Sequence, residues 1–189
     1  MSEPKPDKQR AILDAALILF AERGFHGAPT SLIAERAGVG VGTIYRYFKD
    51  KDALIHELFR ELHARARERI FADYSLEQPI RERFLFIFSR VLRMFIAEPR
   101  EFRFMEQYHY SPYAPVAQAE IPEESELVRQ LLAEARAQQI IKDAPMPVLE
   151  SIAFGPIVAL AKEHISGRQP VDDELIRLTV EACWDGLKR

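Results

Sequence analysis

Side chains that can donate hydrogen bonds to an anion are concentrated between residues 42 and 51, where the sequence reads Gly-Thr-Ile-Tyr-Arg-Tyr-Phe-Lys-Asp-Lys. Hydroxyl, guanidinium and ammonium groups are the donors that proteins direct at phosphate oxygens and at base edges. Arg46 could pair bidentately with a guanine in the major groove. Gly42 would let a DNA backbone approach closely, because glycine has no side chain. This stretch therefore predicts recognition of nucleic acid.

Two short helices joined by a glycine turn would hold these donors on an outer face. Thr30 can cap the first helix, because its hydroxyl can accept a hydrogen bond from a free backbone N–H. Gly38 can end that helix, since glycine adopts the left-handed conformation at little cost. The second helix is expected over about 41–47. A small residue at Ala34, the glycine and the branched Ile44 are spaced as in a helix-turn-helix. Taken alone, these three positions would also suit any helical hairpin.

Residues 9–54 resemble the DNA-binding domain of the TetR family of bacterial transcriptional regulators. The resemblance covers about a quarter of the chain. It is carried by Ile12, Leu13, Ala15, Ala16, Phe20, Gly24, Thr30, Ile33, Ala34, Ala37, Gly38, Val39, the run 42–48, Lys51 and Leu54.

The resemblance implies a protein that binds operator DNA as a dimer and releases it on binding a small molecule. It also implies a phosphate-contacting cap at Thr30. The DNA-contacting positions that it implies are Val41, Gly42, Thr43, Tyr45, Arg46, Tyr47 and Lys51. Many family members carry Tyr-His where this chain has Arg46-Tyr47.

The composition sets limits on the class of protein. The chain has 189 residues, of which 48% are hydrophobic, so it can build one ordinary domain or two small ones. Its net charge of −3 excludes a polybasic coat for nucleic acid. The first 51 residues carry eight basic and six acidic side chains, a net charge of +2. This asymmetry has the sign expected if only the first segment meets DNA.

A single cysteine, Cys183, cannot form an internal disulfide. Together with the lack of a signal peptide, this indicates a reducing cytoplasm. We expect Cys183 to pack as a small apolar residue, with a redox sensor as the alternative. No apolar run reaches the ~18 residues that a membrane span requires, so no membrane partner is expected.

Apolar periodicity predicts an all-α fold of about nine helices. A three-helix DNA-binding domain, residues 1–51, would be joined by a long helix to a ligand-binding and dimerisation domain, residues 52–189. Asp50 and Asp172 are expected to cap the helices that follow them. The helices are expected at about 8–23, 30–37, 41–47, 51–72, 76–97, 99–110, 123–138, 147–166 and 173–187.

Phenylalanine and tyrosine are concentrated between residues 84 and 113. Such a cluster is either core or the wall of a pocket, because ligand pockets are mostly aromatic with a few polar groups. A small apolar or aromatic effector, of unknown identity, would fit such walls. The predicted ligand-binding residues are Phe88, Phe95, Phe102, Met105, Tyr108 and His109.

The last predicted helix carries two apolar stripes. One is Leu175, Leu178 and Ala182, and the other is Ile176, Val180, Cys183 and Leu187. One stripe serves the subunit's own core, and a second implies a partner, for which a twofold dimer is the commonest form. The alternative is a helix tucked deeper into its own subunit. The predicted interface is Ile152, Gly155, Ala159, Ile176, Val180, Cys183 and Leu187, on the two helices that dimerise in the family.

We therefore predict a ligand-responsive regulator that binds a near-palindromic operator as a homodimer, and a repressor by family habit. An enzyme is the first alternative, but Thr43 breaks the glycine-rich nucleotide pattern. The zinc-protease pattern that starts at His56 fails as well, because Arg60 replaces its second histidine. Neither a cofactor nor a metal is expected. The second alternative is a helical partner-binding module without a DNA function.

Overall fold

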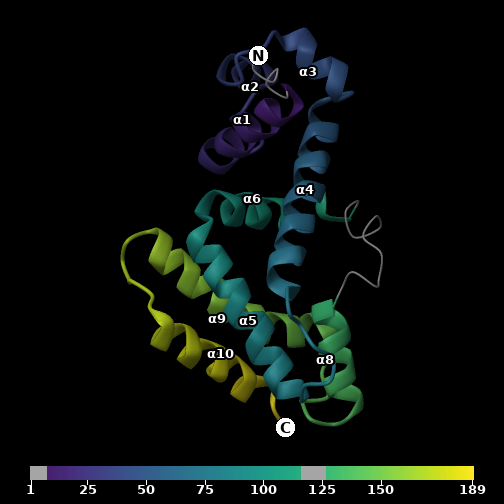
Figure 1. Cartoon of the computed structure of the whole chain (residues 1–189), viewed down its shortest axis with the longest axis vertical. Helices are drawn as coiled ribbons and strands as arrows, with labels where there is room; N and C mark the ends of the chain where they lie inside the picture. Colours follow the sequence, from purple (N-terminus) through teal and green to yellow (C-terminus); the bar gives the residue numbers. More distant parts are fainter. Residues whose placement is uncertain (1–7, 116–126) are drawn as a thin grey trace, which may run out of the picture. The chain divides into compact units, whose positions relative to one another are not determined.

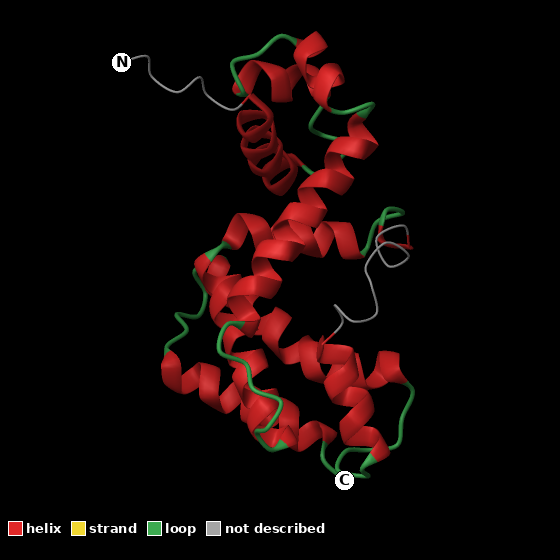
Figure 2. Cartoon of the chain, turned by 45° about the vertical axis from the view of Figure 1, so that its right-hand side comes forward, coloured by secondary structure: helices red, strands yellow, loops and turns green. Residues whose placement is uncertain are grey.

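The computed structural model describes residues 8–115 and 127–189. Over these residues the chain is helical, without a named strand, and its one isolated β-bridge joins Ile141 to Lys188 (Figures 1 and 2). The all-α prediction is confirmed. The described helices are α1 (Lys8–Arg23), α2 (Thr30–Arg36), α3 (Val41–Tyr47), α4 (Lys51–Phe71), α5 (Ile80–Ala97), α6 (Pro99–His109), α8 (Leu127–Ala137), α9 (Met146–Ile165) and α10 (Asp173–Leu187).

The helix starts follow local capping chemistry. Asp50 Oδ1 accepts a hydrogen bond from the Ala53 N–H at 2.8 Å, and Asp172 Oδ1 accepts one from the Leu175 N–H at 2.9 Å. Both predicted caps are confirmed. The cap prediction for Thr30 is wrong, because Pro29 occupies the cap position and Thr30 is already the first helical residue.

Helix α5 begins later than predicted. It starts at Ile80, after Pro79 in an extended conformation, whereas the sequence predicted a start near residue 76. The ring of a proline disfavours helical geometry in the residue before it, so the helix cannot extend backwards through this point. The predicted first turn of the helix over 123–138 lies outside the described residues, and the described helix is α8.

The chain divides into two compact units. Over the described residues, the first comprises 8–65 and 100–115, and the second comprises 66–99 and 127–189. The first unit therefore holds α1, α2, α3, most of α4 and nearly all of α6. Each unit is assembled from two separate segments of sequence. A functional boundary at residue 52 stays a prediction.

The first unit is built around the inner faces of its helices. Helices α1, α2 and α3 pack on one another. Ile12, Ile33 and Ile44, one from each of these helices, have no exposed surface, and neither do Phe20 and Leu54. These are the apolar periodic positions that the sequence indicated, and burying them fixes which face of α3 remains outside.

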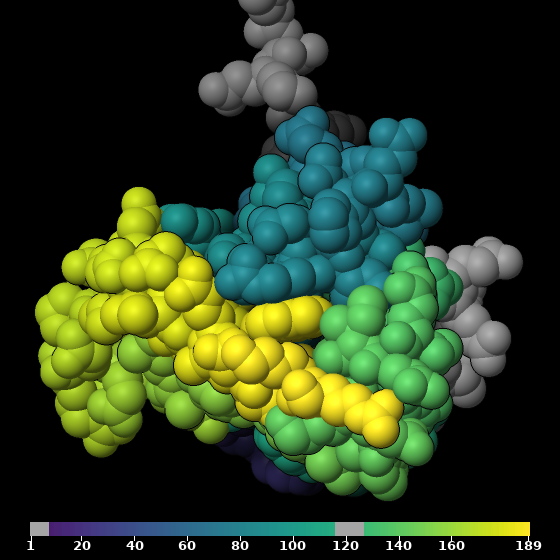
Figure 3. Space-filling view, turned by 90° about the horizontal axis from the view of Figure 1, so that it is seen from below, coloured from purple at the N-terminus to yellow at the C-terminus, as the bar shows by residue number. Residues whose placement is uncertain are grey.

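The second unit is organised on α5, which packs against α8, α9 and α10. The ring of Phe84 stacks on Phe88 with centroids 4.2 Å apart, and Trp184 of α10 lies 5.3 Å from Phe84. The C-terminus is tied to the connector after α8, because the Lys142 N–H donates to the Leu187 carbonyl at 2.8 Å. Figure 3 shows these C-terminal residues, in yellow, beside the green atoms of α8.

Arg83 of α5 is the buried charge of the described residues, with 6% of its surface exposed. Its Nε donates to the Tyr74 hydroxyl at 2.8 Å, and its Nη1 donates to Glu134 of α8 at 2.9 Å. Burial lowers the pKa of Arg83, but these two hydrogen bonds outweigh it, so the net direction is upward. Arg83 therefore stays charged and links α5 to α8.

Candidate nucleic-acid interface

The turn between α2 and α3 has the predicted form. Gly38 adopts a φ of +66°, the left-handed conformation that glycine tolerates best. Its N–H donates to the Glu35 carbonyl at 3.1 Å, and the Val39 N–H donates to the Ala34 carbonyl at 3.0 Å. These bonds close the end of α2 and direct the chain into α3. The turn therefore sets the angle at which α3 is presented.

The outer face of α3 carries large side chains in solvent. Tyr45 is 50% exposed, Tyr47 is 40% exposed and Val41 is 39% exposed, while Arg46 is also exposed. Thr43 is half-buried. Solvent-exposed aromatic side chains are costly for a soluble surface and are typical of binding sites. The predicted outward positions thus form one continuous face.

Two hydroxyl groups from different helices meet at the edge of this face. Thr30 Oγ1 of α2 lies 3.2 Å from the Tyr45 hydroxyl of α3, within hydrogen-bond distance. The Thr30 hydroxyl, which was predicted to cap the first helix of the pair, therefore contacts Tyr45 instead. Each hydroxyl can both donate and accept, so the pair still has a hydrogen to offer to an outside acceptor.

Gly42 has no structural reason to be glycine. A Cβ atom added there would meet nothing within 4 Å, and the residue does not have a positive φ. Glycine costs up to about 1 kcal/mol relative to alanine in a helix, and Gly42 lies in the first turn of α3. Gly42 lies on the exposed face of α3, so the absence of a side chain leaves room there for an approaching molecule.

Lys51, a predicted DNA contact, already has a partner inside the first unit. Its ammonium group donates to the carbonyl of Phe25 and lies 5.8 Å from the centroid of the Phe20 ring. Burial lowers the pKa of Lys51. Lys51 thereby joins the loop after α1 to the start of α4. Its contact with DNA stays a prediction.

Helix α6 contacts α1, and this contact was not predicted from the sequence. The Gln107 side-chain amide donates to the Phe20 carbonyl at 3.1 Å, and the Phe104 ring lies 6.1 Å from the Phe20 ring. Just beyond α6, the Tyr113 hydroxyl donates to Asp52 Oδ1 at 2.8 Å, and burial and Asp52 raise the pKa of Tyr113 to about 12. The only sequence signal was the four-residue spacing of apolar side chains along α6.

A second hydrogen bond joins α6 to α4. His56 Nδ1 lies 2.8 Å from the Tyr108 hydroxyl, and the Tyr108 ring stacks on Phe59 with centroids 4.0 Å apart. With Gln107 and Tyr113, this gives α6 and the following turn polar contacts to both α1 and α4. A displacement of α6 would therefore disturb the helices beneath the candidate DNA face.

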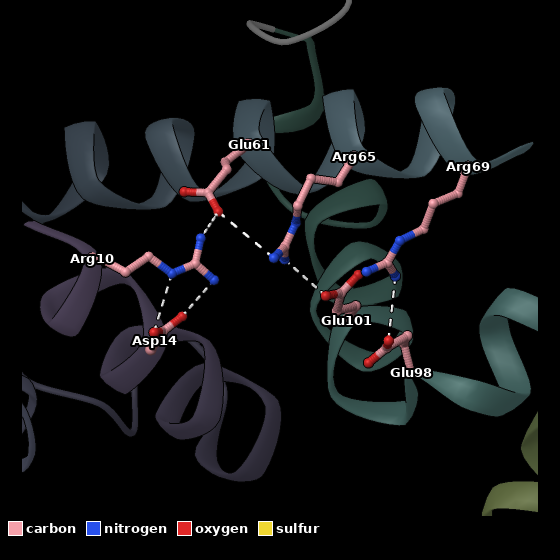
Figure 4. A network of polar contacts seen from close by, with 7 residues as sticks. All are labelled: Arg10, Asp14, Glu61, Arg65, Arg69, Glu98 and Glu101. Atoms are coloured by element: carbon pink, nitrogen blue, oxygen red, sulfur yellow. Dashed lines mark hydrogen bonds and ion pairs between the residues drawn. The ribbon is translucent and has the colours of Figure 1, made fainter. Parts of the chain in front are cut away.

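Charged side chains also connect the helices of the first unit. Arg10 of α1 pairs with Asp14 and with Glu61 of α4, and Arg65 of α4 donates to Glu101 of α6 at 2.8 Å (Figure 4). In the second unit, Arg69 pairs with Glu98 at 3.2 Å. These arginines have carboxylate partners within the chain. Their charges are therefore used in ion pairs between segments of the chain.

The predicted ligand-binding residues fall in both units. Phe88 and Phe95 belong to the second, and the other four belong to the first. Phe88 has no exposed surface and packs on Phe154 at 4.9 Å. Phe102 and Tyr108 are likewise buried, whereas Phe95 and Met105 are half-buried and His109 is exposed. Core packing, the alternative that the sequence left open, describes the three buried rings. A role in ligand binding stays a prediction.

The predicted dimer contacts on α10 need correction. Ile176, Val180, Cys183 and Leu187 are at most 4% exposed, because this stripe packs into its own subunit. Side chains without accessible surface cannot contact a second copy. Burial also raises the pKa of Cys183 to about 11, as expected for a small apolar core residue.

The other stripe of α10 lies outside. Leu178 is 48% exposed, Ala182 is exposed and Leu175 is half-buried. On α9, Gly155 and Ala159 are exposed and Ile152 is half-buried, so these three predicted positions remain accessible. Ile152 Cγ2 would lie 3.1 Å from a Cβ atom at Gly186, which indicates close packing of α9 and α10 at this point.

Within the described residues, no group of three or more His, Cys, Asp or Glu side chains is arranged to hold a metal ion. None of the described helices has the length and apolar character of a membrane span.

Comparison with known families decides the assignment. Residues 12–58 match the model of the bacterial regulatory proteins of the tetR family, and residues 79–188 match the tetracyclin repressor-like C-terminal domain. This chain belongs to the TetR family. Both halves of the chain therefore carry the family's pattern, whereas the sequence resemblance rested on residues 9–54 alone.

Solved structures of TetR family proteins resemble nearly the whole chain. A TetR family transcription regulator from Marinobacter aquaeolei VT8 superimposes with a TM-score of 0.87 and 26% identity, over 96% of each chain. A TetR family protein from Vibrio parahaemolyticus has a TM-score of 0.80 and 28% identity, over 97% of this chain and 99% of that one.

Curated relatives match over shorter stretches. The fatty acid metabolism regulator protein of Bacillus subtilis strain 168 is 37% identical over 90 residues, which are 48% of this chain and 46% of that protein. The HTH-type transcriptional regulator BetI of Klebsiella pneumoniae strain 342 is 38% identical over 66 residues, 35% of this chain and 34% of that protein. This TetR-family chain thus spans less than half the length of these two relatives.

Proposed function

We propose that this protein is a ligand-responsive transcriptional regulator that binds a near-palindromic operator as a homodimer and represses the genes beside it. The observation that carries the proposal is the outer face of α3. Tyr45, Arg46 and Tyr47 are exposed there, on a short helix held at a fixed angle by the Gly38 turn. A helix of this kind fits the major groove, where side chains reach base edges.

The operator should have two half-sites. A dimer presents two copies of α3 to successive major grooves, whose centres are about 34–36 Å apart on one face of the duplex. We assign the dimer contact to the exposed apolar faces of α9 and α10, where Leu178 and Val148, at 48% and 46% exposure, are the large apolar side chains most open to solvent. Val148, Ile152, Gly155 and Ala159 recur at helical spacing on α9, so they share one face.

The effector should be a small molecule with a large apolar part. The second unit holds six of the twelve phenylalanines, and Phe86, Phe95 and Phe154 of that unit are only half-buried. A relative with 37% identity over its matched region is named as a regulator of fatty acid metabolism. A molecule with an acyl chain is therefore the first effector class to test.

Release of DNA requires the effector to favour one state of the protein. A coupling free energy of about 1–3 kcal/mol would weaken operator binding by about 5–150-fold. Helix α4 contributes residues to both units, and α6 contacts α1 and α4 through Gln107 and Tyr108. These two helices are the physical route that we assign to the coupling.

A binding experiment tests the proposal. Duplexes are selected from a random library with the full-length protein. The most strongly enriched duplex is then titrated with the protein at two salt concentrations. Specific binding should weaken with salt, with a slope near −0.9 per phosphate contacted. Fatty acids and acyl thioesters of increasing chain length are then added. Selection of no preferred sequence would favour a partner-binding module. If the affinity for the selected duplex were the same with and without every acyl compound, only this effector class would be rejected.

A further inference from the structure

The exposed cation on α3 lies over the aromatic ring of its neighbour. The guanidinium carbon of Arg46 is 5.2 Å from the centroid of the Tyr47 ring, within the range of a cation–π interaction. The Tyr47 ring in turn lies 6.4 Å from the ring of Phe48, of which only 4% is exposed. The Tyr47 ring is thus close both to the buried ring of Phe48 and to the exposed guanidinium group of Arg46.

We propose that Tyr47 is a positioning residue for Arg46, which rests on the DNA-binding function proposed above. The ring of Tyr47 holds the guanidinium group over it, so that the group reaches a guanine in the major groove already oriented. Reading by Arg46 then depends on the aromatic ring at position 47, and the tyrosine hydroxyl is not required for it.

The chemistry of arginine makes the two contacts compatible. A guanidinium group is planar, and it interacts with an aromatic ring through its face while its edge carries the N–H donors. A guanine accepts two of these donors at O6 and N7. Among the described residues, no carboxylate forms an ion pair with Arg46, in contrast to Arg10 and Arg65. The ring is thus the contact that restricts the Arg46 side chain before DNA arrives.

Most long exposed side chains are mobile, and immobilising them on binding opposes association. An arginine that is already held over a ring loses less freedom when it meets the base. This lower entropic cost favours the contact with guanine, because its two acceptors require a fixed orientation of the guanidinium N–H donors. A phosphate can be contacted from many directions, so a phosphate contact benefits less. Tyr47 should therefore affect sequence preference more than it affects total affinity.

A competing role for Tyr47 is a direct hydrogen bond from its hydroxyl to a phosphate. The two roles make opposite demands on the side chain. Positioning needs an aromatic ring and tolerates phenylalanine. A phosphate contact needs the hydroxyl, so leucine and phenylalanine would be equally damaging.

The test is a double-mutant cycle on the duplex selected with the full-length protein. The Arg46→Ala variant first identifies the base pair at which guanine is preferred, where the preference should fall by about 5–150-fold. Tyr47→Phe should keep this preference within about twofold, and Tyr47→Leu should lower it by about 2–5-fold. In the Arg46→Ala background, Tyr47→Leu should leave the preference at this base pair unchanged. Thermal unfolding of each variant checks that it is folded.

Three results would overturn the positioning role. One is an equal loss with Tyr47→Phe and Tyr47→Leu, accompanied by a salt slope that falls by about 0.9, which assigns Tyr47 to a phosphate. Another is an equal effect of Tyr47→Leu with and without Arg46. Failure of the wild-type protein to select any sequence would instead reject the DNA-binding function. A selected sequence that Tyr47→Leu reads unchanged would reject the positioning role alone.

Discussion

The side-chain amide of Gln107 on α6 donates a hydrogen bond to the backbone carbonyl of Phe20 near the end of α1, at 3.1 Å. These residues are 87 positions apart in the sequence, and the bond belongs to the first compact unit. The Phe20 carbonyl also accepts the Gly24 N–H at 2.9 Å, within the turn that ends α1. Gln107 therefore shares its acceptor with the Gly24 N–H, in the turn from which the chain continues towards α2.

The first prediction is that Gln107→Leu lowers the free energy of unfolding by about 1 kcal/mol, the typical net value of one hydrogen bond. The loss should be moderate, because the Phe20 carbonyl keeps its bond to Gly24. Urea unfolding of the full chain measures it. Gln138→Leu is the matched control, since Gln138 lies just after α8, is exposed and bonds to Glu134 of that helix. Equal stability of the two variants would mean that Gln107 does not anchor α6.

The second prediction separates stability from DNA binding at Gly42. Gly42→Ala should raise the free energy of unfolding by up to about 1 kcal/mol, because alanine favours the helix and its Cβ atom meets nothing in the chain. The same methyl group should weaken binding to the selected duplex by at least about fivefold, the equivalent of ~1 kcal/mol. Thermal unfolding and a mobility-shift titration measure the two effects. An alanine variant with unchanged DNA affinity would remove Gly42 from the interface.

The third prediction concerns Gln139, which has a φ of +58° just after α8. A side chain in the left-handed conformation costs about 1–2 kcal/mol, whereas glycine avoids this cost and loses part of the gain through its freer unfolded state. Gln139→Gly should therefore raise the free energy of unfolding by up to about 1 kcal/mol. Loss of its exposed hydrogen bond from Arg189, at 3.2 Å, should matter little.

A neighbouring position supplies the control for Gln139. Gln138 is exposed and has an ordinary backbone conformation, so Gln138→Gly should lower stability where Gln139→Gly raises it. The same sign for both variants would show that backbone strain is not the cause. Gln139→Gly also controls the experiment at Gly42, because it should stabilise the protein and leave DNA affinity unchanged.

Much of the DNA-binding region could be predicted because its determinants are local. Gly38 marks a left-handed turn by its residue type, and Asp50 marks a helix start by its position before an apolar periodic run. The placement of α6 could not be predicted in this way. Gln107 and Phe20 meet through tertiary packing, and helical periodicity shows which face of α6 is buried without showing which helix covers it.

The two stripes of α10 illustrate the same limit. Periodicity identified both, but it could not decide which one faces the subunit's own core. The structure buries the longer stripe, from Ile176 to Leu187, next to Trp184. That choice removes more apolar surface from water, because the longer stripe runs the length of the helix. Leu178 and its neighbours are consequently left outside.

The fourth prediction is a pH dependence set by Tyr113. Burial, and then the hydrogen bond to Asp52, raise the pKa of Tyr113 to about 12, above the ordinary value of 10.0. The folded protein therefore favours the neutral phenol. Its contribution to stability is complete below pH 10 and is lost as the pH rises towards 12. Tyr113→Phe lacks this group, so the stability difference between wild type and variant should shrink across that interval.

Chemical unfolding at a series of pH values from 8 to 12 measures this difference. Tyr110→Phe is the control, because Tyr110 is 80% exposed and its removal should leave the stability curve unchanged. Comparing the two variants separates Tyr113 from the other groups that ionise in strong base. A constant gap between wild type and Tyr113→Phe over the whole range would argue against the contact with Asp52.

The fifth prediction tests the proposed dimer face at Leu178. Leu178→Arg should leave the subunit folded, because the side chain is already 48% exposed, and should weaken the dimer by about 10–100-fold. Leu76→Arg is the matched control: Leu76 is 69% exposed in the same unit but lies in the loop before α5. Sedimentation measures the dissociation constant, and circular dichroism checks folding.

Val180→Arg should instead unfold the subunit, because Val180 is 1% exposed. Since one copy of α3 reads only a half-site, Leu178→Arg should also require a higher protein concentration to bind the full operator. If Leu178→Arg remained as dimeric as Leu76→Arg, the partner would have to lie on another face of the second unit.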